Sequence, residues 1–189
     1  MKANHQIIYL NGPSSSGKTT LAKALQQAFE QPYLHIGLDR VIEMMPDKLN
    51  NWEGEPAPLG FSWKSSADET GHIVQEIQTG PFAEKMIQTF MEIVLSTAKI
   101  GHYIIIDDVS FGKCQVDTWR EVLNEFKVLW IGINAPLDIL EQREQARGNR
   151  ILGSARAQHL RIHQGMRYAL EFETHRDSLE IMVHKILES

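Results

Sequence analysis

One short motif near the start of the chain constrains the fold more than any other feature. Residues 12–19 read Gly-Pro-Ser-Ser-Ser-Gly-Lys-Thr, which satisfies the pattern G-x-x-x-x-G-K-[S/T] at every fixed position. An apolar run over 6–10 precedes the motif, and apolar residues recur at helical spacing from Lys18 to Phe29. The motif therefore lies between a predicted strand and a predicted helix. This context distinguishes a phosphate-binding loop from a turn that merely caps a helix.

Each part of this motif has a separate physical use. Successive backbone N–H groups of such a loop surround a phosphate, and the glycines permit its tight path. The helix that begins near Lys18 directs the positive end of its dipole to the same place. Lys18 supplies a charge for the β- and γ-phosphates, and Thr19 supplies a hydroxyl for Mg²⁺. We therefore predict that the following residues bind ATP: Gly12, Pro13, Ser14, Ser15, Ser16, Gly17, Lys18, Thr19 and Thr20.

The remaining apolar runs predict an α/β fold. Three of them show little alternation, as do strands that are buried on both faces of a parallel sheet: residues 33–38, 103–106 and 128–133. A weaker run over 168–174 predicts a last strand. Helical patterns separate the strands, at residues 41–45, 82–100, 115–126, 136–146, 154–165 and 178–187. Because strands alternate with helices, we predict a single P-loop NTPase domain over 1–189, with a five-stranded parallel sheet and helices on both faces.

Residues 47–80 follow neither pattern. Prolines interrupt the segment, and it holds two of the four tryptophans, Trp52 and Trp63. We interpret it as a loop-rich insertion with room for a short helix, of the kind that forms lids and binding loops. Trp52, Phe61 and Trp63 either line an apolar pocket or anchor a long loop, and the sequence leaves both roles open.

Composition excludes several classes of protein. The 19 basic and 24 acidic residues give a formal net charge of −5, which argues against a protein that coats nucleic acid. No apolar stretch reaches the roughly 18 residues of a membrane span, and the N-terminus lacks the features of a signal peptide. We therefore expect no membrane partner and a cytoplasmic location. Nothing in the sequence indicates the oligomeric state.

The cysteine and the histidines give weaker signals. The single cysteine, Cys114, cannot form an intramolecular disulfide, which fits a reducing compartment, and we interpret it as a small buried residue. His159 and His163 are spaced i, i+4, but no third metal ligand accompanies them. We interpret this pair as part of a surface face rather than a zinc site.

Two carboxylates follow the strand predicted at 103–106. In P-loop proteins, a carboxylate at such a strand end holds Mg²⁺, and Asp107 is the nearer fit to that position. Asp108 faces the opposite side if the pleat continues, toward substrate or a loop. The alternative for both residues is a solvated strand end.

Asp39 follows the strand predicted at 33–38. The ligand crevice of an open parallel sheet lies outside the carboxyl ends of its strands, so Asp39 shares an edge with the phosphate loop. A carboxylate there can orient an acceptor hydroxyl and accept its proton. The alternative is an N-cap for a helix that begins near Arg40, and the two roles are compatible.

Three arginines lie close together at Arg143, Arg147 and Arg150. The first two are spaced i, i+4 and share a helix face. Arginines near the γ-phosphate stabilise the charge of the transferred group, and a mobile lid that excludes water is a suitable carrier. We place this lid at about 143–155. The alternative is a solvated helix face that nearby glutamates partly neutralise.

Together these motifs resemble the chloramphenicol phosphotransferase family of small P-loop kinases. The matching stretches are GPSSSGKTT at 12–20, GLD at 37–39 with IEMMP at 42–46, IIIDDV at 104–109, VLWIGI at 128–133 and REQARGNR at 143–150. They occur in the family's order and at similar spacing, whereas residues 47–80 match least well. The resemblance implies a fold like that of the nucleotide and shikimate kinases, with a closing lid. It also implies that Asp39 is the base for the acceptor hydroxyl, and that the three arginines belong to the lid and contact ATP.

The sequence thus predicts an enzyme that transfers the terminal phosphoryl group of ATP to a hydroxyl of a small molecule, as chloramphenicol 3-O-phosphotransferase does. The catalytic candidates are Lys18, Asp39, Arg143, Arg147 and Arg150, and the candidate Mg²⁺ ligands are Thr19 and Asp107. One alternative is a kinase of the same fold for a nucleotide, a nucleotide sugar or another metabolite. Few basic residues lie between 40 and 80, which disfavours a highly anionic acceptor. A second alternative is a regulatory module that binds ATP without transfer. Such a module needs no carboxylate beside the γ-phosphate.

Overall fold

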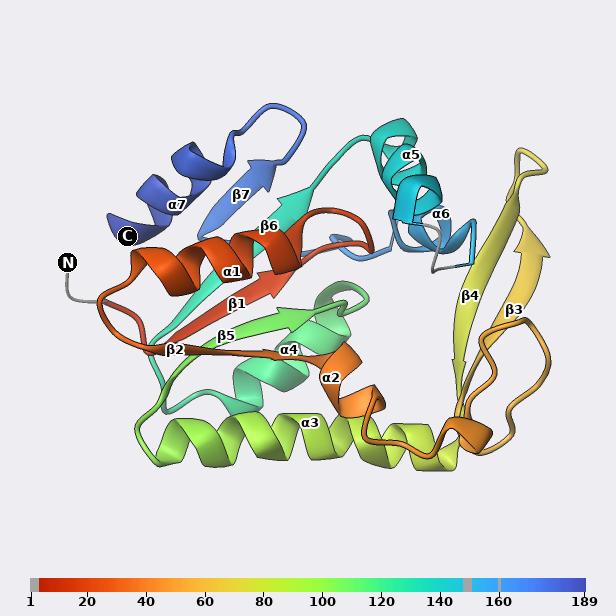
Figure 1. The fold of residues 1–189 in the computed structure, drawn as a ribbon, viewed down its shortest axis with the longest axis horizontal. Coiled ribbons are helices and arrows are strands. Elements are labelled where there is room, and N and C mark those ends of the chain that lie inside the picture. Colours follow the sequence, from red (N-terminus) through yellow and green to blue (C-terminus); the bar gives the residue numbers. More distant parts are fainter. Residues whose placement is uncertain (1–3, 148–150, 160) are drawn as a thin grey trace.

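A computed structural model gives the fold of residues 4–147, 151–159 and 161–189, and Figure 1 shows a central sheet between two layers of helices. The sheet has five parallel strands in the order β2-β5-β1-β6-β7. Their bounds are β1 Ile7–Asn11, β2 Tyr33–Gly37, β5 Tyr103–Asp108, β6 Val128–Asn134 and β7 Leu170–Glu173. The predicted five-stranded parallel sheet is therefore confirmed.

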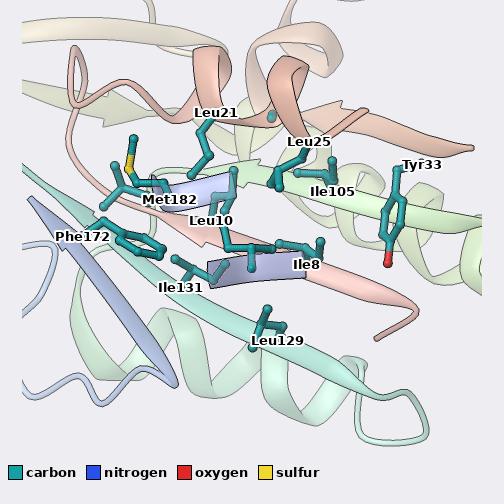
Figure 2. Close-up of a cluster of buried hydrophobic side chains, with 13 residues drawn as sticks. Ile8, Leu10, Leu21, Leu25, Tyr33, Ile105, Leu129, Ile131, Phe172 and Met182 are labelled. Carbon is teal, nitrogen blue, oxygen red and sulfur yellow. The ribbon is translucent and has the colours of Figure 1, made fainter. Parts of the chain in front are cut away.

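Helices cover both faces of this sheet, as the unalternating strands indicate. On one face lie α1 (Lys18–Ala28) and α7 (Leu179–Leu187), and on the other lie α3 (Pro81–Lys99) and α4 (Gly112–Val122). Neighbouring residues of β1 point to opposite faces, so Ile8 packs with the first helix layer and Ile7 with the second. Figure 2 shows Leu21 and Leu25 of α1 directed at the side chains of the sheet.

The connections of β1 and β5 leave the sheet on opposite sides. Strands β1, β5 and β2 end at the same level of the sheet. Asp107 of β5 pairs with Leu10 of β1 on one side and with Gly37 of β2 on the other. The chain continues from β1 into α1 on one face, and from β5 into α4 on the other. Such a reversal opens a crevice at the carboxyl ends of the strands.

Three smaller helices and a hairpin surround that edge of the sheet (Figure 1). They are α2 (Leu38–Ile42), α5 (Leu137–Arg147), α6 (Ser154–His159) and the antiparallel pair β3 (Phe61–Ala67) and β4 (Ile73–Thr79). A 3-10 helix, η1, spans Asp47–Leu49. Within the described residues, no helix combines the length and the hydrophobicity that a membrane crossing needs.

The hairpin corrects the prediction that 47–80 is loop-rich. Phe61 and Trp63 lie on one face of the hairpin, with Ile77 of β4 paired to Trp63. The same face continues with Ser65 and Gln75, which pair across the strands and hydrogen-bond through their side chains at 2.7 and 2.9 Å. Because this face is apolar for only part of its length, the alternation that marks a strand is broken in the sequence.

Three helices also differ from their predicted bounds. Helix α2 spans Leu38–Ile42 rather than 41–45. The pattern predicts a helix over 154–165, but α6 ends at His159 and turns follow over 161–165. The carbonyls of Ile162 and Gln164 there accept hydrogen bonds at 3.2 Å from the backbone N–H groups of Gly112 and Lys113. These carbonyls are the acceptors for the first backbone N–H groups of α4. That helix begins at Gly112 rather than near residue 115.

Candidate active site

A large cavity lies at the carboxyl ends of β1, β2 and β5. Its volume is about 1220 Å³, and its lining comes from the phosphate loop, the strand ends, the hairpin and the helices α2, α3, α5 and α6. It occupies the crevice that the reversal between β1 and β5 creates. The following candidates from the sequence line it: Ser14, Ser15, Gly17, Lys18, Thr19, Thr20, Asp39, Asp107, Arg143 and Arg147.

The phosphate loop has the tight path that its glycines imply. Gly17 has a φ of 101° and is the residue before α1, and Ser15 adopts a φ of 65° in the left-handed region. A Cβ atom on Gly12 would lie 2.2 Å from the carbonyl oxygen of Ile133, which leaves no room for a side chain. A non-glycine residue in the left-handed region is strained, and such strain concentrates at functional sites.

Three serine hydroxyls of this loop test its fit to a phosphate. The Oγ atoms of Ser14, Ser15 and Ser16 are buried, and none has a hydrogen-bond partner among the described residues. Buried polar atoms without partners are rare in proteins and require an explanation. Phosphate oxygens in the loop would accept from hydroxyl and backbone N–H donors. The loop therefore fits a nucleotide phosphate.

Lys18 holds its ammonium group against the phosphate loop. Its side chain is buried, and Nζ donates to the carbonyl oxygens of Gly12 at 2.8 Å and Pro13 at 3.0 Å. The same nitrogen lies 4.0 Å from Oδ1 of Asp107. The charge of Lys18 is thus placed between the loop and the carboxylate at the end of β5.

Asp107 and Thr19 form a small cluster of oxygen donors. The Thr19 hydroxyl donates to Oδ2 of Asp107 at 2.7 Å, and Nε2 of His35 lies 3.2 Å from the same oxygen. Burial favours a raised pKa of Asp107, but the His35 contact, the Lys18 charge and the Thr19 hydrogen bond outweigh it. The pKa of Asp107 is therefore lowered, and the group is a carboxylate at neutral pH.

This donor set fits Mg²⁺, because Mg²⁺ prefers oxygen ligands and keeps several waters and phosphate oxygens. The described residues contain no group of three His, Cys, Asp or Glu side chains that could hold a metal. Among the residues that the structure describes, Thr19 and Asp107 are the pair placed to hold the ion. His35 is a further site residue, and its signal in the sequence is a polar residue inside an otherwise apolar strand.

Asp39 lies in the first turn of α2, exposed to solvent and on the wall of the cavity. The predicted N-cap role is wrong. Helix α2 begins at Leu38, the N-cap residue is Gly37, and no side chain caps the helix. The carboxylate of Asp39 is thus not used as an N-cap.

The predicted arginines divide into three cases. Arg143 is half-buried and donates to the hydroxyl of Thr174 at 2.8 Å, to the carbonyl of Thr174 at 3.2 Å and to the carbonyl of Ser15 at 3.4 Å. Arg147 is exposed and lines the cavity. Arg150 lies outside the described residues. The alternative of a solvated helix face is therefore wrong for Arg143, which links α5 to the phosphate loop.

Comparison with known protein families identifies the chain. A family model described as "Chloramphenicol phosphotransferase-like protein" matches residues 5–189. The chain belongs to this family. Membership makes it a phosphotransferase-type enzyme with a P-loop nucleotide site.

Individual relatives agree with this assignment. A protein from two strains of Mycobacterium tuberculosis, named provisionally as an O-phosphotransferase, is 25% identical over 185 residues, which cover 97% of this chain and 81% of the relative. Among solved structures, the Mycobacterium tuberculosis APS kinase in complex with AMPPNP and APS has a TM-score of 0.67 at 15% identity, with full coverage of both chains. A gluconokinase from Sinorhizobium meliloti 1021 has a TM-score of 0.59 at 14% identity, with 99% and 92% coverage. The chloramphenicol phosphotransferase-like chain thus shares the P-loop kinase fold.

One wall of the cavity in this family member is aromatic. Trp52 lies 6.2 Å from Phe61 and 6.1 Å from Trp63, between ring centroids, and all three residues line the cavity. Phe61 is also buried in a small core with Met45 and Ala83. The two roles left open by the sequence are therefore both present. Phe61 anchors the hairpin, and Trp52 and Trp63 face the cavity.

Asp108 is buried and accepts hydrogen bonds from three side chains, so it is not a solvated strand end. Its Oδ2 accepts hydrogen bonds from Tyr9 at 2.9 Å, from the Ser110 hydroxyl at 2.6 Å and from Nε1 of Trp119 at 2.8 Å. Burial, followed by the charge of Asp108, raises the pKa of Tyr9 well above its usual value, so the phenol stays a donor. The expectation that Asp108 faces the opposite side from Asp107, toward a loop, agrees with these contacts, whereas a solvated strand end does not.

We predict that Asp108→Ala destabilises the protein by about 3 kcal/mol, because three buried donors lose their acceptor. The midpoint of urea denaturation would measure the loss. Asp47→Ala, which removes an exposed carboxylate, is the matched control and should change stability by less than about 0.5 kcal/mol. Equal midpoints for the two variants would contradict the buried network.

Two minor expectations are wrong. Cys114 is exposed on α4, not buried. His163 is not on a surface face, because α6 has ended before it. Its Nδ1 lies 2.9 Å from the hydroxyl of Tyr168, and its Nε2 is buried.

Proposed function

We propose that this enzyme transfers the γ-phosphoryl group of ATP to a hydroxyl of a small molecule, with Mg²⁺. One observation carries the proposal: the phosphate loop, the Thr19–Asp107 pair and Asp39 line one cavity, together with an aromatic wall. A module that only binds ATP needs neither Asp39 nor such a wall. The provisional name of the Mycobacterium tuberculosis relative supports transfer to oxygen.

The donor side binds and neutralises the triphosphate. Lys18 and the backbone of the loop hold the β- and γ-phosphates, and the serine hydroxyls add hydrogen bonds. Thr19 and Asp107 hold Mg²⁺, which neutralises charge on the phosphate oxygens. Arg143 already contacts the loop at Ser15. With Arg147 and Arg150 it stabilises the transferred group, on a lid at about 143–155.

The acceptor side positions the hydroxyl. Asp39 accepts its proton while the hydroxyl oxygen forms a bond to the γ-phosphorus, the bond from phosphorus to the bridging oxygen breaks, and ADP leaves. The segment 47–80 supplies most of the aromatic wall. Because the reaction consumes ATP and needs Mg²⁺, both of which the cytoplasm supplies, we place it in the cytoplasm.

The charges on the acceptor side favour an uncharged acceptor over an anionic one. Arg40 lies 3.1 Å from a carboxylate oxygen of Glu43, and Arg161 lies 3.1 Å from one of Glu76. Both arginines line the cavity, and each is paired with a carboxylate. A nucleotide or sugar-nucleotide acceptor would have to displace these carboxylates, whereas an aromatic alcohol can stack on Trp52 and Trp63.

We predict that a panel of hydroxylated compounds will show ATP-dependent phosphorylation of an uncharged aromatic alcohol, with chloramphenicol as one member. Mass spectrometry would detect the addition of one phosphoryl group, and reactions with EDTA in place of Mg²⁺ are the control. Preferred phosphorylation of a nucleoside monophosphate or a carboxylated metabolite would contradict the acceptor class. ATP binding without phosphorylation of any member would favour the regulatory module.

A further inference from the structure

The short helix α6 carries a glutamine into the phosphate loop. Oε1 of Gln158 accepts a hydrogen bond from the backbone N–H of Ser14 at 2.6 Å, across a sequence separation of 144 residues. Gln158 is 7% exposed, and both residues line the cavity. Figure 1 shows α6 between the β1–α1 connection and the hairpin. A buried polar side chain thus lies at the position where the loop meets the phosphates.

The contact with Ser14 fixes which way the amide of Gln158 faces. A backbone N–H only donates, so the oxygen of the amide must be the atom that accepts from it. The two N–H groups of Nε2 are then the part of the side chain that remains. Among the described residues, no hydrogen bond engages Nε2. Gln158 therefore has two donors to offer at the wall of the cavity.

Helix α6 is held firmly from both sides. The buried carboxylate of Glu144 on α5 accepts from the backbone N–H groups of Gly153 at 2.8 Å and Ala155 at 2.9 Å, and from the Ser154 hydroxyl at 2.5 Å. These bonds satisfy donors at the start of α6. Arg156 of α6 pairs with Glu141, also on α5, at 2.7 Å, and on the hairpin side with Asp68 of the β3–β4 turn at 3.1 Å.

We infer that Gln158 is a further catalytic residue, which donates from Nε2 to the terminal phosphoryl group of the bound nucleotide. The inference rests on the proposed function. Charge spreads over the equatorial oxygens of the phosphoryl group during transfer, and preorganised donors stabilise it there. An amide supplies such a donor without a further positive charge, and its bond to Ser14 holds it beside the phosphate loop at the cavity wall.

A competing role predicts the opposite result. Gln158 occupies the N–H of Ser14, so it could instead compete with phosphate for a donor of the loop. Its removal would then strengthen nucleotide binding. A donor to the terminal phosphoryl group, by contrast, strengthens the binding of a nucleoside triphosphate but not that of a diphosphate.

The test compares the affinities of AMPPNP and ADP, each with Mg²⁺, by calorimetry. In Gln158→Glu an oxygen remains to accept from Ser14, but the amide donor is lost. Gln158→Met keeps the length of the side chain without polar atoms. We expect both variants to bind AMPPNP at least about tenfold more weakly than the wild type and ADP within about twofold. Gln145→Glu, an exposed change on α5, makes the same charge change near the site and should alter neither affinity.

Each other outcome overturns the inference. Unchanged or tighter AMPPNP binding in both variants would assign the competing role. Equal loss of AMPPNP and ADP binding would make Gln158 a structural support of the loop. A wild type that binds neither nucleotide would refute the proposed function itself, and the inference with it. If the wild type binds both nucleotides and the variants show the same preference between AMPPNP and ADP, the inference is refuted but the proposed function is not.

Discussion

Replacement of Lys18 by alanine should lower the rate of phosphoryl transfer by at least about 10²–10³-fold, the range seen when one preorganised charge stabiliser is removed from an active site. The ammonium of Lys18 is buried, bonded to two carbonyls of the loop and 4.0 Å from Asp107. Its loss removes the positive charge closest to the expected position of the β- and γ-phosphates. It also leaves the buried carbonyl of Gly12 without its Nζ donor, whereas the carbonyl of Pro13 keeps the backbone N–H of Ser16. Nucleotide affinity should therefore fall as well.

The measurement is kcat and KM for ATP with an acceptor found in the panel. Lys99→Ala, which removes an exposed lysine at the end of α3, is the matched control and should leave both constants unchanged. Lys18→Arg keeps the charge but not the compact shape of the ammonium, and we expect it to remain strongly impaired. Activity of Lys18→Ala close to that of the wild type would refute the mechanism as a whole.

The features that the sequence predicted are those that depend on residues close together in the chain. The phosphate loop depends on consecutive residues and on the strand and helix beside it, and all of these are visible in the pattern. The sheet was predictable because strands buried on both faces are apolar without alternation, as Ile104–Ile106 illustrate. The pleat of β5 likewise predicted that Asp107 and Asp108 face opposite sides.

Features that depend on distant partners were not predictable. The hairpin was not predicted because two polar residues, Ser65 and Gln75, lie on the same face as Phe61 and Trp63. Their side chains hydrogen-bond to each other, and only the fold brings them together. Gln158 and Thr174 gave no signal, because their partners in the phosphate loop lie 144 and 158 residues away. The same holds for Asp108, whose burial depends on Tyr9 and Trp119.

Replacement of Asp39 by alanine or asparagine should separate catalysis from nucleotide binding. Asp39 lies in the first turn of α2 on the cavity wall, and it is not an N-cap. Removing a general base lowers the rate by about 10²–10⁴-fold, and we expect kcat to fall within that range. AMPPNP affinity should stay within about twofold of the wild type, because the phosphates are held by the loop and not by α2. Asparagine tests the base itself, since it keeps the shape of the side chain but cannot accept the proton.

Three results of that experiment lead to different conclusions. A fall in kcat with intact AMPPNP binding in both variants supports Asp39 as the base and excludes a module that only senses ATP. Wild-type turnover in the asparagine variant, with loss in the alanine variant, would mean that Asp39 only orients the acceptor by hydrogen bonding. Unchanged turnover in both would refute any role for Asp39 in transfer. Asp47→Asn, an exposed change further along the same segment, should leave kcat unaltered, so a fall in Asp39→Asn reports its place beside the acceptor and not the loss of a negative charge alone.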